Sequence, residues 1–390
     1  NRKILWFTDT LNDLNGVSIT LKQMGWQFYA NGMEVSIVTS LLPEEITEDI
    51  PPNTVNLPAV STIPLPYYDR YTLKIPSLLK SLKELHKYDP DEIIISTPGP
   101  LGFLGVLTAK LMSVPMTGVY HTDFTKELGE IAGEQMAVQV VEAFTRWFYS
   151  MMDTIKVPTV AYMDILEKRG LDRSKMSVFP RQIDSDSFCY RHPQEINGSK
   201  LNLPEGINLL FVGRVSKDKN LDFLIDVYRK AREQRGDLNL IITGDGPYLN
   251  EMKQMLKGDE RVLFTGIVPS DRLPLIYSQA HAFVFPSITD TYGMVVLEAQ
   301  CCELPAIVSD MGGPCEIIED GETGFKLPAL DINVWVKSIL DFVKMVEEEP
   351  DRYRSMRRNS RRRAINKAGW DNVLKQLASE ELFPKPVPQR

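Results

Sequence analysis

Cysteine, excess basic charge and long apolar segments are all scarce in this chain. Its 390 residues include four cysteines, none in a CxxC spacing, which excludes a disulfide scaffold and gives no sign of a metal site. No apolar run approaches the roughly 20 residues of a membrane span, and no signal-peptide pattern opens the sequence. We therefore expect a reduced, cytoplasmic compartment. Because 44 Lys and Arg stand against 52 Asp and Glu, a net charge of −8, nucleic acid is not expected as a partner.

The remaining composition is that of a folded protein. With 43% hydrophobic and 25% charged residues, a disordered or low-complexity chain is excluded. A length of 390 residues exceeds what one hydrophobic core usually spans, so we expect two domains.

Short apolar runs alternate with amphipathic segments along most of the sequence. The runs interpreted as strands are residues 4–7, 35–38, 92–95, 116–120, 154–157, 208–212, 238–243, 262–264, 282–285 and 306–308. The segments interpreted as helices include 17–31, 221–234, 249–256, 331–349, 351–366 and 370–382. This alternation predicts an α/β protein of two doubly wound parallel domains that face a cleft. The aperiodic polar stretch 188–206 is the expected boundary.

Two basic segments leave contact with a membrane surface open. Residues 352–363 contain seven arginines, which fits a patch for anionic lipid headgroups or a solvated helix face with counter-charges nearby. Residues 74–87 mix leucines with lysines, which fits a helix on a membrane surface or an ordinary helix that faces the core.

Three loops between a predicted strand and a predicted helix contain glycine or cations. Gly16 stands where a helix begins, and the free N–H groups at a helix start favour phosphate. Gly213 is followed by Arg214 and Lys219, cations suited to a diphosphate. The turn with Gly244 is mostly structural.

The most specific pattern is the segment PSITDTYGMVVLEA, in which a loop with Asp290 leads into a helix near Gly293. The N–H groups of Tyr292, Gly293 and Met294 are then free donors for a phosphate, and carboxylates on either side can hold hydroxyl groups. Glu298 lies in an apolar run, where a carboxylate without a partner is costly to bury. A sugar-nucleotide site is therefore favoured over a helix cap and a surface glutamate.

Taken in order, these motifs resemble those of retaining GT-B glycosyltransferases of family 4. The family pattern runs G-R-x-x-x-x-K-N, G-x-G-P, P-S-x-x-E-x-[FY]-G-x-x-x-x-E-A and a later G-x-P-x-x-x-S/T-x-x-G-G, and residues 213–325 follow it. The resemblance extends to residues 8–16, 120–124 and 370–371. It implies a GT-B fold with an acceptor-side Rossmann-like domain (1–187), a nucleotide-sugar domain (188–365) and a C-terminal helix (366–390) that returns to the first domain.

The resemblance also implies roles for particular residues. Arg214 and Lys219 would neutralise the diphosphate, Asp290 would bind the hydroxyls of the transferred sugar, Glu298 would bind those of the ribose, and His121 would lie near the transferred sugar. The remaining donor-binding candidates are Gly16, Gly213, Gly244, Ile267, Tyr292, Gly293 and Met294.

Two departures from the family pattern stand out. Asp290 replaces the usual Glu, as in a branch with mannosyl- and sulfoquinovosyltransferase-like members. Gln182 stands where the R-G-V-D pattern has Gly, which leaves the acceptor side open.

The function implied by the resemblance is transfer of a hexose from a UDP- or GDP-sugar to a hydroxyl of a lipid or saccharide acceptor. The resemblance also implies that the anomeric configuration is retained and that neither a metal nor another cofactor takes part. The alternatives are a nucleotide-sugar epimerase of GT-B shape, a sugar phosphorylase with pyridoxal phosphate, and a non-catalytic sugar-nucleotide binding protein. The nucleotide base, the sugar, the acceptor and the oligomeric state are left undetermined.

Overall fold

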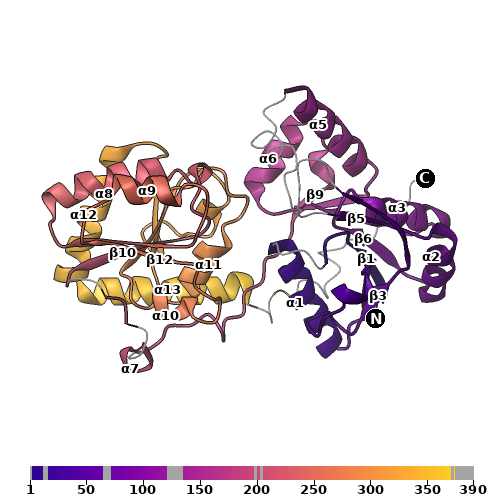
Figure 1. Cartoon of the computed structure of the whole chain (residues 1–390), viewed down its shortest axis with the longest axis horizontal. Coiled ribbons are helices and arrows are strands. Elements are labelled where there is room, and N and C mark those ends of the chain that lie inside the picture. The colour runs from indigo at the N-terminus through magenta and orange to yellow at the C-terminus, as the bar shows by residue number, and fades with distance from the viewer. Residues whose placement is uncertain are drawn as a thin grey trace. The chain divides into compact units, whose positions relative to one another are not determined.

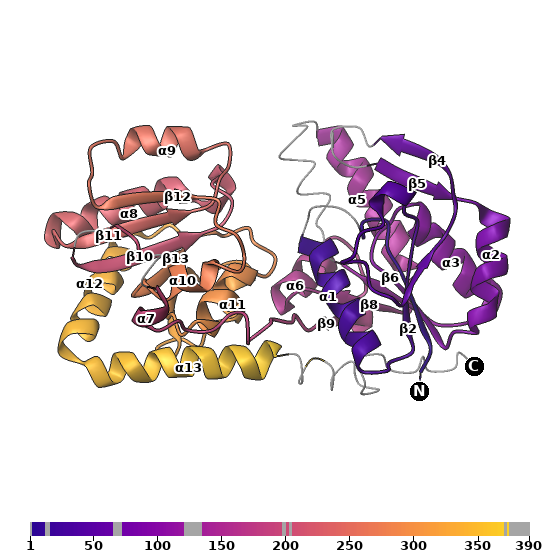
Figure 2. The same cartoon turned by 60° about the horizontal axis from the view of Figure 1, so that its bottom comes forward.

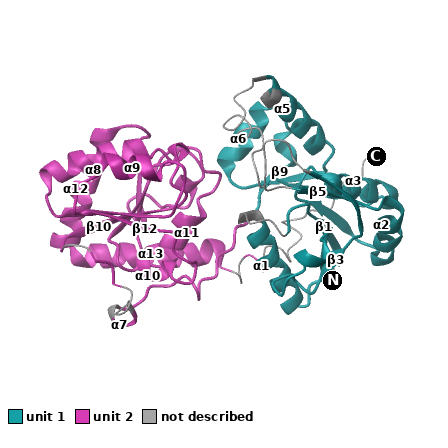
Figure 3. Ribbon diagram, viewed as in Figure 1, with its two compact units in different colours: residues 1–179, 377–390 teal, residues 180–376 magenta. Residues whose placement is uncertain are grey.

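The chain divides into two compact units, the first built mainly from residues 1–179 and the second from residues 180–376 (Figure 3). The computed structural model describes residues 2–11, 16–64, 72–120, 135–196, 200–202, 205–369 and 373. Apart from Val373, the helix predicted over residues 370–382 lies outside these ranges.

Seven strands of the first unit form a parallel sheet in the order β3-β2-β1-β6-β7-β8-β9 (Figures 1 and 2). The strands are β1 (Ile4–Phe7), β2 (Val35–Thr39), β3 (Thr54–Asn56), β6 (Glu92–Ile95), β7 (Met116–Val119), β8 (Thr154–Val157) and β9 (Met176–Val178). The helices are α1 (Gly16–Ala30), α2 (Leu78–Leu85), α3 (Pro100–Met112), α5 (Gln135–Ser150) and α6 (Val160–Lys168). Strand order reverses between the neighbours β1 and β6, which places a topological switch point there.

An antiparallel hairpin of β4 (Ala59–Pro64) and β5 (Thr72–Pro76) was not predicted from the sequence. The interpretation of residues 74–87 as one helix is therefore wrong at its start, since Lys74 belongs to β5 and the helix α2 begins only at Leu78. The Lys74 ammonium is buried and forms a 2.7 Å ion pair with Glu45. This pairing explains why a lysine is tolerated in the strand.

The second unit has a six-stranded parallel sheet in the order β12-β11-β10-β13-β14-β15. The strands are β10 (Ile207–Val212), β11 (Leu238–Thr243), β12 (Val262–Gly266), β13 (Ala282–Phe285), β14 (Ala306–Ser309) and β15 (Gly324–Leu327). The helices are α7 (Pro193–Ile196), α8 (Leu221–Gln234), α9 (Leu249–Met255), α10 (Leu273–Tyr277), α11 (Met294–Cys301), α12 (Ile332–Glu348) and α13 (Pro350–Ala368).

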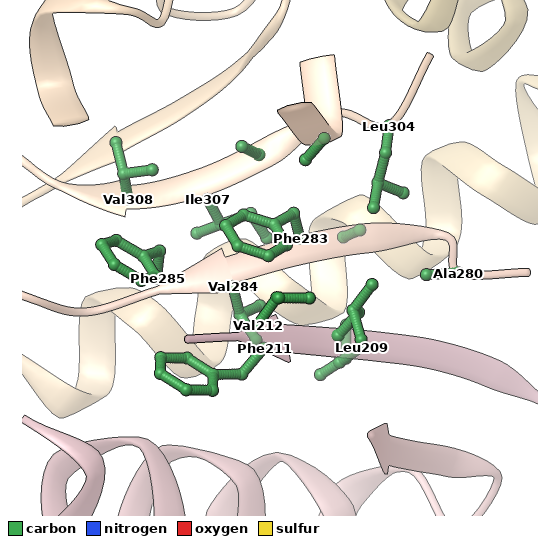
Figure 4. Packing of buried hydrophobic residues seen from close by; sticks show 14 of the residues in the cluster. Leu209, Phe211, Val212, Ala280, Phe283, Val284, Phe285, Leu304, Ile307 and Val308 are labelled. Atoms are coloured by element: carbon green, nitrogen blue, oxygen red, sulfur yellow. The ribbon is translucent and has the colours of Figure 1, made fainter. Parts of the chain in front are cut away.

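The central strands β10, β11, β13 and β14 are buried at every position except Asn208 of β10. Phe285 of β13 stacks on Phe211 of β10, with ring centroids 5.6 Å apart, and on Phe283 of its own strand at 5.7 Å (Figure 4). Continuous burial follows because helices cover both faces of a parallel sheet. Every strand predicted from the short apolar runs is present, with ends that differ by no more than two residues.

Most arginines of α13 form ion pairs or hydrogen bonds with other residues of the second unit. Five of the seven make contacts within the unit. Arg352 pairs with Glu349 just before the helix, Arg354 pairs with Asp351 in its first turn, and Arg357 and Arg363 donate to backbone carbonyls. Arg361 donates to three carbonyls, those of Ser185, Phe188 and Cys301. This arrangement favours the structural interpretation of residues 352–363 over a lipid-binding patch. In the same region the Ile183 N–H donates to the Ala368 carbonyl at 2.8 Å, so the two ends of the unit lie side by side.

Candidate functional site

The candidate site of the second unit lies at its topological switch point. Strand order reverses between the neighbours β10 and β13, and ligands of open α/β sheets bind at the carboxyl ends of the strands at such a point. The loop after β10 holds Arg214 and Lys219, and the loop after β13 holds Asp290. The two loops are tied together, because the Thr289 hydroxyl donates to the Asp218 carbonyl at 3.0 Å.

Lys219 and Asp290 form the central ion pair of this site. The Lys219 ammonium lies 2.9 and 3.0 Å from the two carboxylate oxygens of Asp290 and 3.3 Å from Asp218. Both side chains of the pair are about four-fifths buried, with 18% and 20% exposed. Burial alone would lower the pKa of Lys219, but the two carboxylates raise it above its ordinary value. Lys219 is therefore a fixed cation that stays charged at any physiological pH.

Arg214 is exposed at the carboxyl end of β10. Within the described residues its guanidinium has no ion pair or side-chain hydrogen bond. A planar guanidinium of this kind is suited to a phosphate. Because Lys219 is balanced by two carboxylates, Arg214 is the cation of this loop that is available to an incoming anion.

The start of α11 adds uncharged donors beside the ion pair. Gly293 precedes the helix with φ of 90°, a left-handed conformation that favours glycine. No acceptor among the described residues contacts the N–H groups of Gly293 and Met294. The loop after β14 is hydrogen-bonded to this turn, because the Gly313 N–H donates to the Asp290 carbonyl at 2.8 Å. The site thus presents free amides at a helix start, where anions bind.

Glu298 is held by a tyrosine that sequence reasoning missed. The Tyr277 hydroxyl, on α10, donates to Glu298 Oε2 at 2.9 Å. Burial raises the pKa of Glu298 to about 7, although the Tyr277 hydrogen bond opposes the shift. The cost of burying a carboxylate in an apolar helix face suggested that Glu298 needs a partner, but no pattern in the sequence singles out Tyr277, which lies 21 positions away.

The remaining donor candidates occupy nearby loops of the same sheet. Gly213 follows β10, and its N–H donates to the Thr243 carbonyl at 3.0 Å. Tyr292 is buried with the Arg181 guanidinium 5.7 Å from its ring centroid. Ile267 follows β12 and is 76% exposed. An exposed apolar side chain next to a free backbone at a strand end is available to a flat ligand such as a base.

Gly244 is required by the close approach of two loops. Its φ is 130°, and a Cβ at this position would overlap the carbonyl oxygen of Gly213. We expect Gly244→Ala to lower the free energy of unfolding by about 3 kcal/mol or more, from strain plus overlap. Urea unfolding followed by circular dichroism measures this. Gly236→Ala, where a Cβ meets nothing within 4 Å, is the matched control, and an equal loss in both variants would contradict the assignment.

In the first unit the switch point lies between β1 and β6, where Asp9 organises the loops. Asp9 accepts hydrogen bonds from the Thr97 hydroxyl at 2.5 Å and from the Leu101 N–H at 2.9 Å. Asp9 therefore caps the start of α3, a role that the sequence did not suggest. Gly16 begins α1, as expected. The candidate His121 lies outside the described residues.

Two negative findings concern the described residues alone. They contain no group of three or more His, Cys, Asp and Glu side chains arranged to hold a metal ion. None of their helices combines the length and apolar character that crossing a bilayer requires.

Together the two sheets define a two-domain α/β protein of the Rossmann kind. The family model described as Glycosyltransferase Family 4 matches residues 14–187, and the model described as Glycosyl transferases group 1 matches residues 194–363. The chain belongs to these family 4, group 1 glycosyltransferases, as the motifs predicted.

Similar sequences that are named glycosyltransferases support this assignment. A sulfoquinovosyl transferase of Arabidopsis thaliana is 30% identical over 270 residues, 68% of this chain and 52% of its own length. The chain thus spans about half the length of that relative. A GDP-mannose-dependent alpha-mannosyltransferase of Mycobacterium tuberculosis is 27% identical over 321 residues, 82% of this chain and 78% of its own.

Solved structures share the fold over almost the whole chain. HepE of Anabaena, crystallised with UDP, has a TM-score of 0.72 at 17% identity and covers 98% of this chain and 99% of its own. Sucrose-phosphate synthase of Thermosynechococcus elongatus has a TM-score of 0.70 at 20% identity, with 98% of both chains covered. The predicted GT-B fold is therefore confirmed.

Proposed function

We propose that the chain transfers a hexose from a UDP- or GDP-linked sugar to a hydroxyl of a lipid or saccharide acceptor, with retention at the anomeric carbon and without a metal or other cofactor. The observation that carries the proposal is the buried Lys219–Asp290 pair beside the free amides of Gly293 and Met294, at the switch point of a sheet within the group 1 match. Relatives that use GDP-mannose and fold neighbours crystallised with UDP and UDP-glucose support the choice of donor.

In this proposal the donor diphosphate sits against Arg214, Lys219 and the amides of Gly293 and Met294. Arg214 binds first, since it carries no partner in the described part of the chain. The phosphates then share Lys219 with Asp290, whose carboxylate becomes free to accept hydrogen bonds from the sugar hydroxyls. Glu298 holds the ribose, and the backbone at Ile267 contacts the base.

The chemical step depends on stabilising the departing diphosphate. Fixed cations and N–H dipoles that already point at the site cost no reorganisation when negative charge develops on the leaving oxygen. The acceptor hydroxyl attacks from the face that the nucleotide leaves, and the leaving phosphate takes its proton. In the proposed division of the chain, residues 1–187 form the acceptor-side domain, residues 188–365 bind the donor, and residues 366–390 return to the first domain. Gly16 and His121 belong to the acceptor-side domain, where Gly16 lets its loop approach the donor phosphates and His121 lies near the transferred sugar.

Release of nucleotide from UDP- and GDP-hexoses, measured with and without acceptor after EDTA treatment, tests this proposal. We expect release only when diacylglycerol or a saccharide acceptor is present, a product whose anomeric configuration by NMR equals that of the donor, and a rate within about twofold of the untreated enzyme. A changed sugar without acceptor would indicate an epimerase. Binding without turnover would indicate a non-catalytic protein, and a rate abolished by EDTA and restored by Mg²⁺ would refute metal independence.

A further inference from the structure

Arg181 places a guanidinium beside the start of α11. Its Cζ atom lies 5.7 Å from the ring centroid of Tyr292, the residue that precedes Gly293. The side chain is half-buried, and its Nε atom is shielded from solvent without a hydrogen-bond acceptor among the described residues. Nor does any carboxylate of the described ranges form an ion pair with it. Arg181 is therefore a cation of the second unit that the described part of the chain does not neutralise.

Burying such a cation is unfavourable unless a partner offsets the lost hydration. Burial lowers the pKa of Arg181, and within the described residues only the Tyr292 hydroxyl opposes this shift. A contact between a guanidinium and an aromatic ring returns part of the cost, but buried charges in proteins are normally paired and hydrogen-bonded. An arginine keeps its charge at any physiological pH, so deprotonation does not remove the cost. The arrangement is that of a residue whose acceptor is a ligand.

A second arginine of the same unit shows what a structural role looks like. The Arg357 guanidinium lies 4.5 Å from the ring centroid of Tyr190, much as Arg181 lies over Tyr292. Its Nε atom, however, donates to the Glu303 carbonyl at 3.0 Å. Arg357 thus combines a ring contact with a hydrogen bond that ties α13 to the turn after α11, whereas Arg181 has the ring contact alone.

The backbone next to Arg181 is fixed. The Ile183 N–H donates to the Ala368 carbonyl at 2.8 Å. Two residues further along the chain, the Ser185 carbonyl accepts a hydrogen bond from Arg361 at 3.1 Å. A guanidinium on a fixed backbone, with its ring contact already made, loses little conformational entropy when an anion binds. Arg181 is therefore preorganised for a ligand.

We infer that Arg181 is an anion-binding residue of the site at the start of α11, and that its ligand is a charged group of the sugar nucleotide. The second step rests on the proposed function. The free amides of Gly293 and Met294 directly follow the residue on whose ring Arg181 lies, so the guanidinium and the amides serve one region of the unit. The fork of N–H donors in a guanidinium matches the paired oxygens of a phosphate or a carboxylate. In a sugar nucleotide these oxygens belong to the diphosphate or to an acidic substituent of the sugar.

Calorimetric titration of the full chain with UDP, UDP-glucose, UDP-glucuronic acid and GDP-mannose tests the inference. The variant is Arg181→Met, which keeps an apolar contact with the Tyr292 ring, and the matched control is Arg357→Met. We expect Arg181→Met to weaken binding about 10- to 100-fold, the range for hydrogen bonds between charged groups, and the control to bind as the wild type does. A similar loss for every ligand that binds assigns the diphosphate, and a loss confined to UDP-glucuronic acid assigns an acidic group on the sugar.

Arg181→Lys and the melting temperatures separate binding from a structural role. Lysine keeps the charge but not the planar fork, so we expect it to recover only part of the affinity. Without ligand, we expect Arg181→Met to melt at or above the temperature of the wild type, because it removes a buried cation without a partner. We expect Arg357→Met to melt lower, because the Glu303 carbonyl loses its donor. A lower melting temperature for Arg181→Met together with unchanged affinity would make Arg181 structural and overturn the inference.

Thermal shift with sodium pyrophosphate separates this inference from the proposed function. If pyrophosphate stabilises the wild type but not Arg181→Met, and no nucleotide binds, the anion site stands and the proposed function fails. If nucleotides bind the wild type and Arg181→Met equally, the donor site stands and Arg181 is no part of it. Unchanged affinity for every ligand, with equal stabilisation of both proteins by pyrophosphate, would show that Arg181 binds no anion.

Discussion

Replacing Lys219 by methionine is expected to lower kcat/KM for the sugar donor by about 10²- to 10³-fold, the effect of removing one preorganised group from an oxyanion-stabilising site. Methionine keeps the length of the side chain and loses the ammonium that lies 2.9 Å from Asp290. The diphosphate then loses its fixed cation, and Asp290 is left as a buried carboxylate without that partner. Steady-state rates of nucleotide release measure the loss.

Lys217→Met is the matched control, because Lys217 belongs to the same short turn but points to Glu251 and is largely exposed. We expect its rate to stay within about twofold of the wild type, as exposed ion pairs contribute little. The double variant Lys219→Met with Asp290→Asn separates stability from function. If it restores the melting temperature without restoring the rate, the catalytic role stands; recovered turnover would falsify it.

We expect Glu298→Gln to weaken UDP or GDP binding by about 10- to 100-fold at pH 8, the range for hydrogen bonds to a charged acceptor. The pH dependence has a defined sign. With the pKa of Glu298 near 7, a growing fraction of the wild-type side chain is protonated below that pH, so its advantage over the variant shrinks about tenfold between pH 8 and pH 6. Calorimetric titrations at both pH values measure this difference.

Although Glu298→Gln is expected to weaken nucleotide binding, it is expected to increase the stability of the ligand-free protein. Because folding raises the pKa of Glu298 from 4.5 to about 7, the folded state holds this proton over a range where the unfolded state has lost it, and stability falls as pH rises through that range. Glu298→Gln removes the cost of burying a charged carboxylate. At pH 8 we therefore expect the free energy of unfolding of the variant to exceed that of the wild type by on the order of 2 kcal/mol, and at pH 4.5 we expect the two values to be nearly equal. The exposed Glu260→Gln is the control, and a variant less stable at pH 8 would contradict a buried carboxylate.

Much of the fold could be predicted from the sequence because its signals are local. A parallel strand covered on both faces is a short apolar run, as in residues 282–285, and a helix start at Gly293 is marked by the glycine and the periodicity that follows. The β4–β5 hairpin lacks such a signal, since its partly exposed strands mix polar and apolar residues.

The chemistry of the site was less accessible because it depends on pairs distant in the chain. The order of the motifs predicts that Lys219 and Asp290 contact the same ligand. It does not predict the hydrogen bond between the two side chains, which lie 71 positions apart in the sequence. Tyr277 and Asp9 were missed for the same reason. The sequence indicates which types of residue are present, and only packing decides which of them meet.

Hydrogen bonds hold the two ends of the second unit together: Ile183 bonds to Ala368, and Arg361 bonds to the carbonyls of Ser185 and Phe188. Its chain enters and leaves at adjacent backbone positions, joined at 2.8 Å between the Ile183 nitrogen and the Ala368 oxygen. A unit whose ends meet is topologically an insert, which can be exchanged without rerouting the rest of the chain. Under the proposed function, such an exchange combines one donor-binding unit with different acceptor-binding halves during evolution.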